Sequence, residues 1–307
     1  MKTNFLIISL LLICNVFAQN YWEKTNCPSN GLVTGLIINN NGHIFACDGT
    51  AIYRSTNNGN SWERVINGLG LDKKGSIGSL FATDSKGYLY VNIIGVNIDE
   101  YFRSTNDGNK WIKIKNGLGS KPLVLTSRGL IISNENIKNS PNKIVSISPN
   151  GYVYAGRNDG IARTKDNGVT WESKLYFGET NTQNSSRGNV LAINSLGNIF
   201  VNITMNDSRV SAETDGVYRS TDNGETWTQI LKDINSNIGS VNNMVIGTNK
   251  QIYIGTFNGV YESMTNGDSW TQFNNGLNID NKTISSIIIN PNGQLFIGTS
   301  NGVYRTK

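Results

Sequence analysis

The side chains best suited to act on a ligand lie in or beside four long segments between predicted strands. These segments are residues 93–100, 116–143, 175–188 and 204–216. Together they offer carboxylates, guanidinium groups and an aromatic ring, which suit the binding of a sugar or a polar protein surface. The candidate ligand-binding residues are Asp99, Glu100, Arg157, Asp159, Tyr176, Arg187, Arg209 and Asp215.

Catalysis is the alternative use of the same groups. Two carboxylates about 5 to 10 Å apart could hydrolyse a glycosidic bond, so a glycoside hydrolase remains open. The single histidine, His43, sits at the start of a predicted strand and is more simply a surface or edge residue than a member of a Ser/His/Asp triad or a metal site. The glycines punctuate turns and form no phosphate-binding pattern, so we expect no cofactor and no metal.

Charge indicates little about partners. The chain has 307 residues, with 27 Lys and Arg against 22 Asp and Glu, and the net charge is +5. Because the basic residues are spread along the chain, we expect no nucleic-acid interface. A charged fraction of 16% and a hydrophobic fraction of 37% are those of a folded protein.

The first 18 residues have the pattern of a secretory signal peptide. A basic start at Lys2 precedes an apolar run from Phe5 to Ile13, and a small residue, Ala18, marks the expected cleavage site. The mature domain would then be residues 19–307, in a secreted or periplasmic location. No later segment is long and apolar enough to span a bilayer, so we expect no membrane insertion.

Two cysteines remain after such cleavage. Cys27 and Cys47 form an even pair in an exported chain, which predicts a disulfide. The alternative is two separate buried thiols.

One eight-residue motif returns five times. It occupies residues 55–62, 104–111, 164–171, 220–227 and 263–270. Each copy places Ser or Thr, a short polar residue, Gly and Trp at fixed offsets, which predicts a tight turn between two strands. The residues assigned this structural role are Asn57, Gly59, Trp62, Asn106, Gly108, Trp111, Asp166, Gly168, Trp171, Asp222, Gly224, Trp227, Thr265, Gly267 and Trp270.

The strands around the motif repeat as well, in units of four that we label A to D. The motif joins C to D, and short glycine turns join A to B. Four-stranded units repeated radially predict an all-β, six-bladed β-propeller. After Trp270 one further A, B and C set follows, so Tyr21–Lys24 should complete the last blade. Residues 120–143 leave a degenerate seventh blade open.

This topology sorts the connections onto two faces. A–B turns and motif turns share one face, whereas B–C and D–A connections share the other, which receives all four long segments. An arginine recurs at the end of strand C, and its repetition assigns it to the scaffold. These arginines are Arg54, Arg103, Arg163, Arg219 and Arg305.

The five motifs resemble the Asp-box of BNR repeats, Ser-x-Asp-x-Gly-x-x-Trp, over nearly all of the mature chain. Asp166 and Asp222 keep the aspartate, whereas Asn57, Asn106 and Thr265 replace it. The family, a sialidase-like superfamily, includes hydrolases, receptors and assembly factors, so the resemblance implies a fold and no single activity. No proline has an arginine two positions before it, which disfavours a sialidase.

The sequence therefore predicts a secreted, monomeric and non-catalytic propeller that binds a glycan or an extracellular protein through the face with the long segments. A passive repeat domain without a specific ligand is the third possibility.

Overall fold

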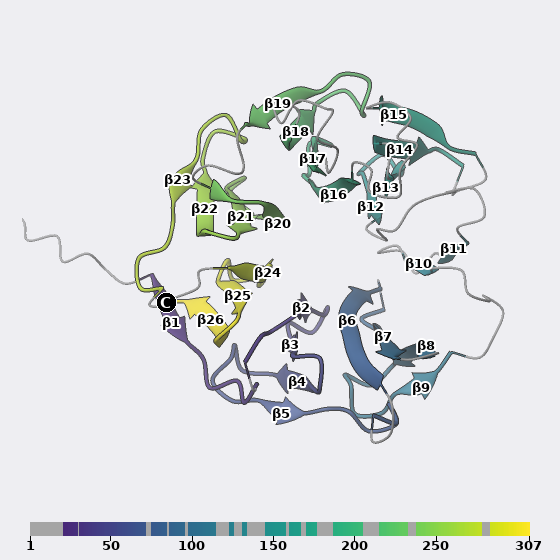
Figure 1. The fold of residues 1–307 in the computed structure, drawn as a ribbon, viewed down its shortest axis with the longest axis vertical. Helices are drawn as coiled ribbons and strands as arrows, with labels where there is room; N and C mark the ends of the chain where they lie inside the picture. The colour runs from purple at the N-terminus through teal and green to yellow at the C-terminus, as the bar shows by residue number, and fades with distance from the viewer. Residues whose placement is uncertain are drawn as a thin grey trace, which may run out of the picture.

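The computed structural model contains six four-stranded antiparallel sheets arranged in a ring (Figure 1). It describes residues 21–29, 31–71, 75–84, 86–95, 98–114, 123–125, 131–133, 145–157, 160–166, 170–176, 187–204, 215–232, 238–277 and 283–307. The predicted all-β, six-bladed architecture is confirmed.

The first three sheets follow the predicted A-B-C-D order. The first contains β2 (Gly35–Ile38), β3 (Ile44–Cys47), β4 (Ile52–Ser55) and β5 (Glu63–Arg64). The second contains β6 (Gly75–Thr83), β7 (Leu89–Gly95), β8 (Ile98–Ser104) and β9 (Ile112–Lys113). The third contains β12 (Val145–Ile147), β13 (Val153–Arg157), β14 (Gly160–Thr164) and β15 (Glu172–Tyr176).

The remaining sheets keep this order except at the end of the chain. The fourth contains β16 (Arg187–Ile193), β17 (Ile199–Thr204), β18 (Gly216–Ser220) and β19 (Thr228–Leu231). The fifth contains β20 (Val241–Ile246), β21 (Ile252–Thr256), β22 (Gly259–Ser263) and β23 (Thr271–Gln272). The sixth contains β24 (Ile284–Ile289), β25 (Leu295–Thr299), β26 (Gly302–Thr306) and β1 (Trp22–Lys24).

The amino-terminal strand closes the ring as predicted. β1 pairs antiparallel with β26, with Trp22 opposite Thr306 and Lys24 opposite Tyr304. The amide of Thr25 extends this pairing by donating to the carbonyl of Val303 at 2.9 Å. The last sheet is therefore built from both ends of the sequence.

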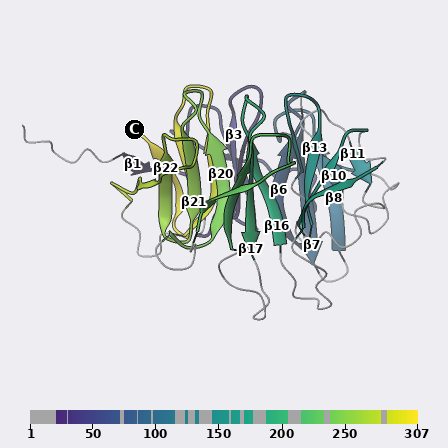
Figure 2. The ribbon, with the colours of Figure 1, turned by 90° about the horizontal axis from the view of Figure 1, so that it is seen from above.

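The A strands face the centre of the ring and the D strands its rim (Figure 1). β2 packs against β6 and β24, and β16 packs against β12 and β20, so neighbouring sheets contact through their inner strands. Seen from the side, the sheets stand next to one another in a flat disc, and their strands run between its two faces (Figure 2).

A two-stranded hairpin lies in the ring between the second and third sheets (Figure 1). β10 (Leu123–Leu125) pairs antiparallel with β11 (Ile131–Ser133). This pair is the part of residues 120–143 that the structure describes, and it forms two strands rather than a four-stranded blade. The hairpin nevertheless occupies the ring position that the seventh-blade alternative addressed.

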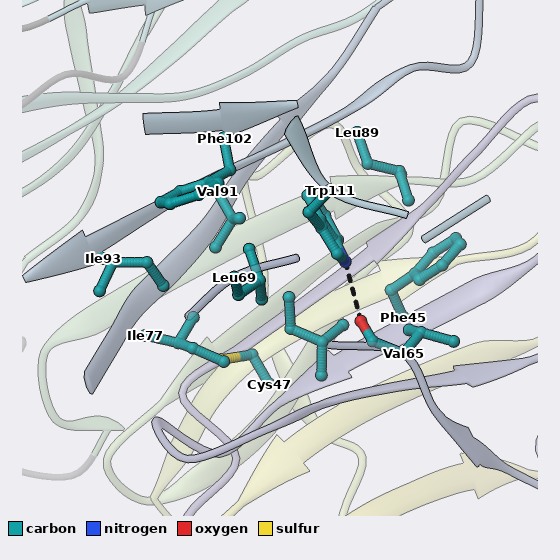
Figure 3. Close-up of a cluster of buried hydrophobic side chains, with 11 residues drawn as sticks. Phe45, Cys47, Val65, Leu69, Ile77, Leu89, Val91, Ile93, Phe102 and Trp111 are labelled. Carbon is teal, nitrogen blue, oxygen red and sulfur yellow. Dashed lines mark hydrogen bonds between the residues drawn. The ribbon is translucent and has the colours of Figure 1, made fainter. Parts of the chain in front are cut away.

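The hydrophobic core is divided into clusters between neighbouring sheets. Strands β21 and β25 are buried along their whole length, whereas the outer strands β9 and β23 are exposed. One cluster joins Phe45 of the first sheet to Leu89 and Phe102 of the second (Figure 3). In the same cluster, the indole nitrogen of Trp111 donates to the carbonyl of Val65 at 2.8 Å. Aromatic packing thus fixes each sheet against the next.

Within the part of the chain that the structure describes, no helix is long and apolar enough to cross a membrane.

Candidate functional site

Each motif turn is held by hydrogen bonds within the motif. In the first copy, the Ser55 hydroxyl accepts from the amide of Gly59 at 2.8 Å, and the Asn57 side-chain oxygen accepts from the amide of Ser61 at 2.9 Å. The copies around Ser104, Ser220 and Ser263 repeat this pattern. These bonds satisfy the turn amides, which explains why the residue types recur.

Aspartate and threonine also fill the polar position of the motif. Hydrogen bonds from the Thr170 hydroxyl, above all, lower the pKa of Asp166 to about 2. The Thr226 hydroxyl acts in the same way on Asp222, whose pKa is also lowered to about 2. In the fifth copy, the Thr265 hydroxyl accepts from the amide of Ser269 at 2.9 Å. All three residue types can therefore cap this turn; Gly168 lies outside the described residues.

The arginine at the end of strand C joins one sheet to the motif turn of the next. Arg54 donates to the carbonyl of Asp107 at 2.6 Å, and Arg163 donates to that of Asn223 at 2.7 Å. The same bond forms from Arg219 to Asn266 and from Arg305 to Asn58. All four acceptors have a positive φ, between 56° and 62°. This left-handed backbone residue is therefore the acceptor at each of these four junctions.

The A–B turns add a second link between sheets on the same face. The Asn39 side chain donates to the Asp107 carboxylate at 2.6 Å, and Asn150 donates to Asn223 at 2.8 Å. Asn290 likewise donates to Asn58 at 3.2 Å. These links place the A–B turns beside the motif turns, as predicted, and we call their common side the motif-turn face.

The opposite side of the disc, at the B–C and D–A connections, we call the long-loop face. Three large apolar side chains are exposed there. They are Leu32 in the connection from β1 to β2, Ile94 near the end of β7, and Phe257 between β21 and β22. Sequence reasoning did not select them, because an isolated apolar residue at a strand end does not reveal its exposure.

The predicted ligand-binding residues occupy the strand ends of this face. Asp99 lies on β8, Arg157 at the end of β13, Tyr176 at the end of β15 and Arg187 at the start of β16. Asp159 and Arg209 lie outside the described residues. The residues therefore share one face, but they are distributed over three sheets.

Residues 93–100 differ from the prediction of a long loop. β7 continues to Gly95 and β8 begins at Ile98, with Ile93 opposite Glu100 in the register. Glu100 forms an ion pair with Lys113 of β9 at 2.7 Å. Apolar residues on both sides continue the pairing of β7 with β8, and the Glu100 ion pair joins β8 to β9 in this structure.

Asp215 lies in an enclosed position. Its residue is 8% exposed, directly before β18, and its backbone carbonyl accepts from the Gln229 side chain at 3.0 Å. The pKa of nearby Tyr218 is raised, first by burial and then by the charge of Asp215. A buried carboxylate at the base of the 204–216 connection is suited to a fixed polar contact.

Cys27 and Cys47 are free thiols in the structure, so it does not contain the predicted disulfide. Cys47 packs in the cluster between the first and second sheets, whereas Cys27 packs against the cluster between the sixth and first. Burial raises the pKa of Cys27 to about 11 and also raises that of Cys47. Both thiols are therefore protonated at neutral pH.

Among the described residues, no group of three or more His, Cys, Asp or Glu side chains is arranged to hold a metal ion.

The ring of radially arranged four-stranded sheets defines the chain as a β-propeller. No family model matches the sequence, and no curated protein matches it. The chain is similar in fold to a streptogramin B lyase, at 14% identity over 94% of this chain and 97% of that one, with a TM-score of 0.64.

Two other solved structures show the same fold. YCF48 bound to D1 peptide is 16% identical over 94% of this chain and 97% of that one, with a TM-score of 0.53. The extracellular domain of BT4673 from B. thetaiotaomicron, described as a hybrid two-component system, is 13% identical with a TM-score of 0.56. That alignment covers 94% of this chain and 40% of the other, so the chain spans less than half the length of that domain.

Proposed function

We propose that this chain is an exported, monomeric β-propeller that binds a protein or glycan ligand through its long-loop face, without turning it over. The candidate contacts are the strand-end residues Asp99, Glu100, Arg157, Tyr176, Arg187 and Asp215, together with Asp159 and Arg209. The signal-like first 18 residues support export.

The observation that carries this proposal is the contrast between the two faces. On the motif-turn face, turn residues and arginines bond one another across four junctions. Exposed apolar side chains lie on both faces: Leu32, Ile94 and Phe257 on the long-loop face, and Leu196 and Met264 on the motif-turn face. The contrast is that the long-loop face also carries the candidate carboxylates and arginines at its strand ends. Apolar side chains among carboxylates and arginines are the composition of a recognition surface.

The structural neighbours and the motif include the proposed class of function without being limited to it. One neighbour is a propeller solved with a bound peptide and another is an extracellular domain, whereas a third is a streptogramin B lyase. The resemblance of the motif to the Asp-box adds a superfamily that includes receptors as well as hydrolases, so it agrees with binding without requiring it.

The test is a parallel screen of residues 19–307 on a glycan array, a peptide array and a panel of chromogenic glycosides. We expect binding without turnover. The double variant Leu32→Ala/Phe257→Ala should weaken binding at least about tenfold, because it removes apolar contact area. The matched control is Leu196→Ala/Met264→Ala, which removes two residues that are each 67% exposed on the motif-turn face, and it should bind normally.

Turnover that is abolished by Asp215→Asn would replace this proposal with a hydrolase. Binding that the control variant weakens as much as the test variant would move the site to the motif-turn face. Silence in all three screens would favour a passive repeat domain.

A further inference from the structure

The junction between the fifth and sixth sheets differs from the four described above. In the sixth sheet, strands C and D are β26 and β1, which come from opposite ends of the sequence, so no motif turn connects them. At this junction a cavity of about 190 Å³ opens on the motif-turn face. Its walls include Tyr21, Tyr253, Phe273, Leu295 and Lys307, and we call it the seam cavity.

The other junctions show what occupies the equivalent place. A Cβ built on Gly108 would lie 3.0 Å from Val65 and 3.5 Å from Phe45 of the preceding sheet. One built on Gly59 would lie 3.1 Å from Thr25 and 3.3 Å from Phe296. Gly224 meets Tyr154 and Lys174 in the same way. These three glycines thus pack against an aromatic residue of strand B and a residue three positions after the Trp at the start of strand D.

In the fifth sheet, the same two positions are Tyr253 and Phe273. Both line the seam cavity, and their rings lie 5.7 Å apart. Tyr21 stacks on Phe273 with ring centroids 4.7 Å apart and an interplanar angle of 16°, and it is 45% exposed. The cavity therefore corresponds to the space that a motif glycine fills at the other junctions, which we call the glycine niche. One of its walls is the accessible ring of Tyr21.

The charge beside the niche is reversed as well. Where four of the other sheets carry an arginine that donates to the turn carbonyl, the fifth sheet carries Glu262. Burial, followed by Glu262, raises the pKa of Tyr253 to about 12. In the third sheet the equivalent Tyr154 donates to the turn carbonyl of Asn223 at 3.0 Å. A carboxylate at position 262 would repel a carbonyl oxygen and attract a hydrogen-bond donor or a cation.

We propose that the seam cavity binds a glycine-containing turn of a partner polypeptide that carries a Lys or Arg side chain next to its glycine. The glycine enters between Tyr253 and Phe273, and the basic side chain meets Glu262. The shape of the seam cavity favours a glycine-containing turn. The presence of Glu262 where four other sheets have an arginine favours a basic side chain in that turn. This site lies on the face opposite the one in our proposed function, so each can fail without the other.

The test uses three cyclic peptides and residues 19–307. The first copies residues 220–227 with lysine at the position of Glu225, the side chain that meets Arg163 in the protein, and is closed by a disulfide between added terminal cysteines. The second keeps glutamate there. The third is the lysine peptide with valine at the position of Gly224. Affinities are measured by NMR titration. We expect the lysine peptide to bind at least about tenfold more tightly than either of the others.

The protein variants make the result specific. Glu262→Arg introduces the charge found at the four motif junctions, so it should weaken binding of the lysine peptide and strengthen that of the glutamate peptide. Tyr21→Ala should weaken both. Asn60→Arg, an exposed charge change on the motif turn of the first sheet, is the control and should leave this preference unchanged.

Several results would overturn the proposal. One is a failure of all three peptides to bind; another is equal binding of the valine peptide. A third is a peptide preference that Glu262→Arg does not alter. Displacement of the peptide by a hexose at comparable concentration would assign the cavity to carbohydrate, and a Tyr21-dependent dimer would assign it to a second copy of the chain.

Discussion

Neighbouring sheets are joined in one way at four junctions of the ring and in another way at the seam between the fifth and sixth sheets. At the four junctions, a motif turn inserts its glycine and accepts a hydrogen bond from an arginine of the preceding sheet. At the seam, β1 pairs with β26 and Trp22 donates to the carbonyl of Phe273 at 2.7 Å. Chain continuity supplies the turn in one case, whereas in the other non-covalent pairing closes the ring and leaves a cavity.

This difference indicates that the strand-C arginine and the motif turn of the next sheet occur together. The arginine pattern breaks at Glu262, which is also where the following sheet lacks a motif turn. Arg103, the strand-C arginine of the sheet that precedes the β10–β11 hairpin, instead lies over the Tyr88 ring at 5.6 Å from its centroid. We infer that an arginine occurs at the end of strand C where the carbonyl of a residue with positive φ in the next sheet faces it.

The largest effect expected from the comparison is at Trp22. Trp22→Ala should lower the free energy of unfolding by about 3–5 kcal/mol, because it empties a buried aromatic site. It should also release β1, which no turn holds to β26. Trp111→Ala, an equally buried position at a motif junction, is the control. Urea unfolding should show a similar loss for both, and hydrogen exchange of β1 should accelerate only for Trp22→Ala. Equal exchange in both variants would contradict the distinction.

The next effect tests the arginine link. Arg163 is 2% exposed and bonds Asn223, Glu172 and Glu225. Arg163→Ala should cost about 2–3 kcal/mol, because charge-assisted bonds are lost and a turn carbonyl loses its donor. Glu262→Ala, at the matching position of the fifth sheet, should change stability by less than about 0.5 kcal/mol. Thermal or urea unfolding would decide, and similar costs at both positions would break the comparison.

A smaller effect separates packing from backbone strain. Gly108 and Gly293 have φ values of 82° and 83°, so alanine is strained at both. That strain should cost about 1–2 kcal/mol in each case. A Cβ on Gly108 would meet Val65 at 3.0 Å, whereas one on Gly293 has nothing within 4 Å. Gly108→Ala should therefore lower the urea midpoint further than Gly293→Ala; the reverse order would show that the niche is not close-packed.

The smallest effect concerns acid. Asp166 and Asp222 have a pKa lowered to about 2 by hydrogen bonds in their turns. The stability they contribute is present above their unfolded pKa, near 3.9, and is lost as the pH falls toward about 2. Asp166→Asn/Asp222→Asn should flatten stability between about pH 4 and pH 2, since Asn57 and Asn106 already cap equivalent turns. Unfolding curves across this range would test it, and an unchanged slope would contradict it.

Much of the fold could be predicted from the sequence, because strand alternation and the motif are local signals. The pairing of Tyr21–Lys24 with the last strand followed from counting tryptophan-led strands. The extension of β7 and β8 through residues 93–100 was missed, because the insertion was treated as a loop although its apolar residues continue the hairpin. The arginine-to-carbonyl bonds depend on neighbouring sheets, so the sequence indicated only that the arginines repeat.

The candidate site was less accessible to such reasoning. Topology predicted which face receives the long connections, but the exposure of Leu32 and Phe257 depends on the packing around them. The seam cavity has a sequence signal, namely a glutamate where an arginine recurs. That signal indicates a cavity only once the structure places Tyr253 and Phe273 beside Tyr21.

Hydrogen exchange of the amides that flank the β1–β26 pairing in residues 19–307 is the most direct test of the central claim, that non-covalent pairing of the two chain ends closes the ring. The account predicts that the amides of Thr25 and Lys307, which donate to Val303 and Tyr21, exchange as slowly as those of Val65 and Phe273 at the D strands of the first and fifth sheets. Exchange of the Thr25 and Lys307 amides at the rate of an unstructured peptide, while Val65 and Phe273 remain protected, would contradict it.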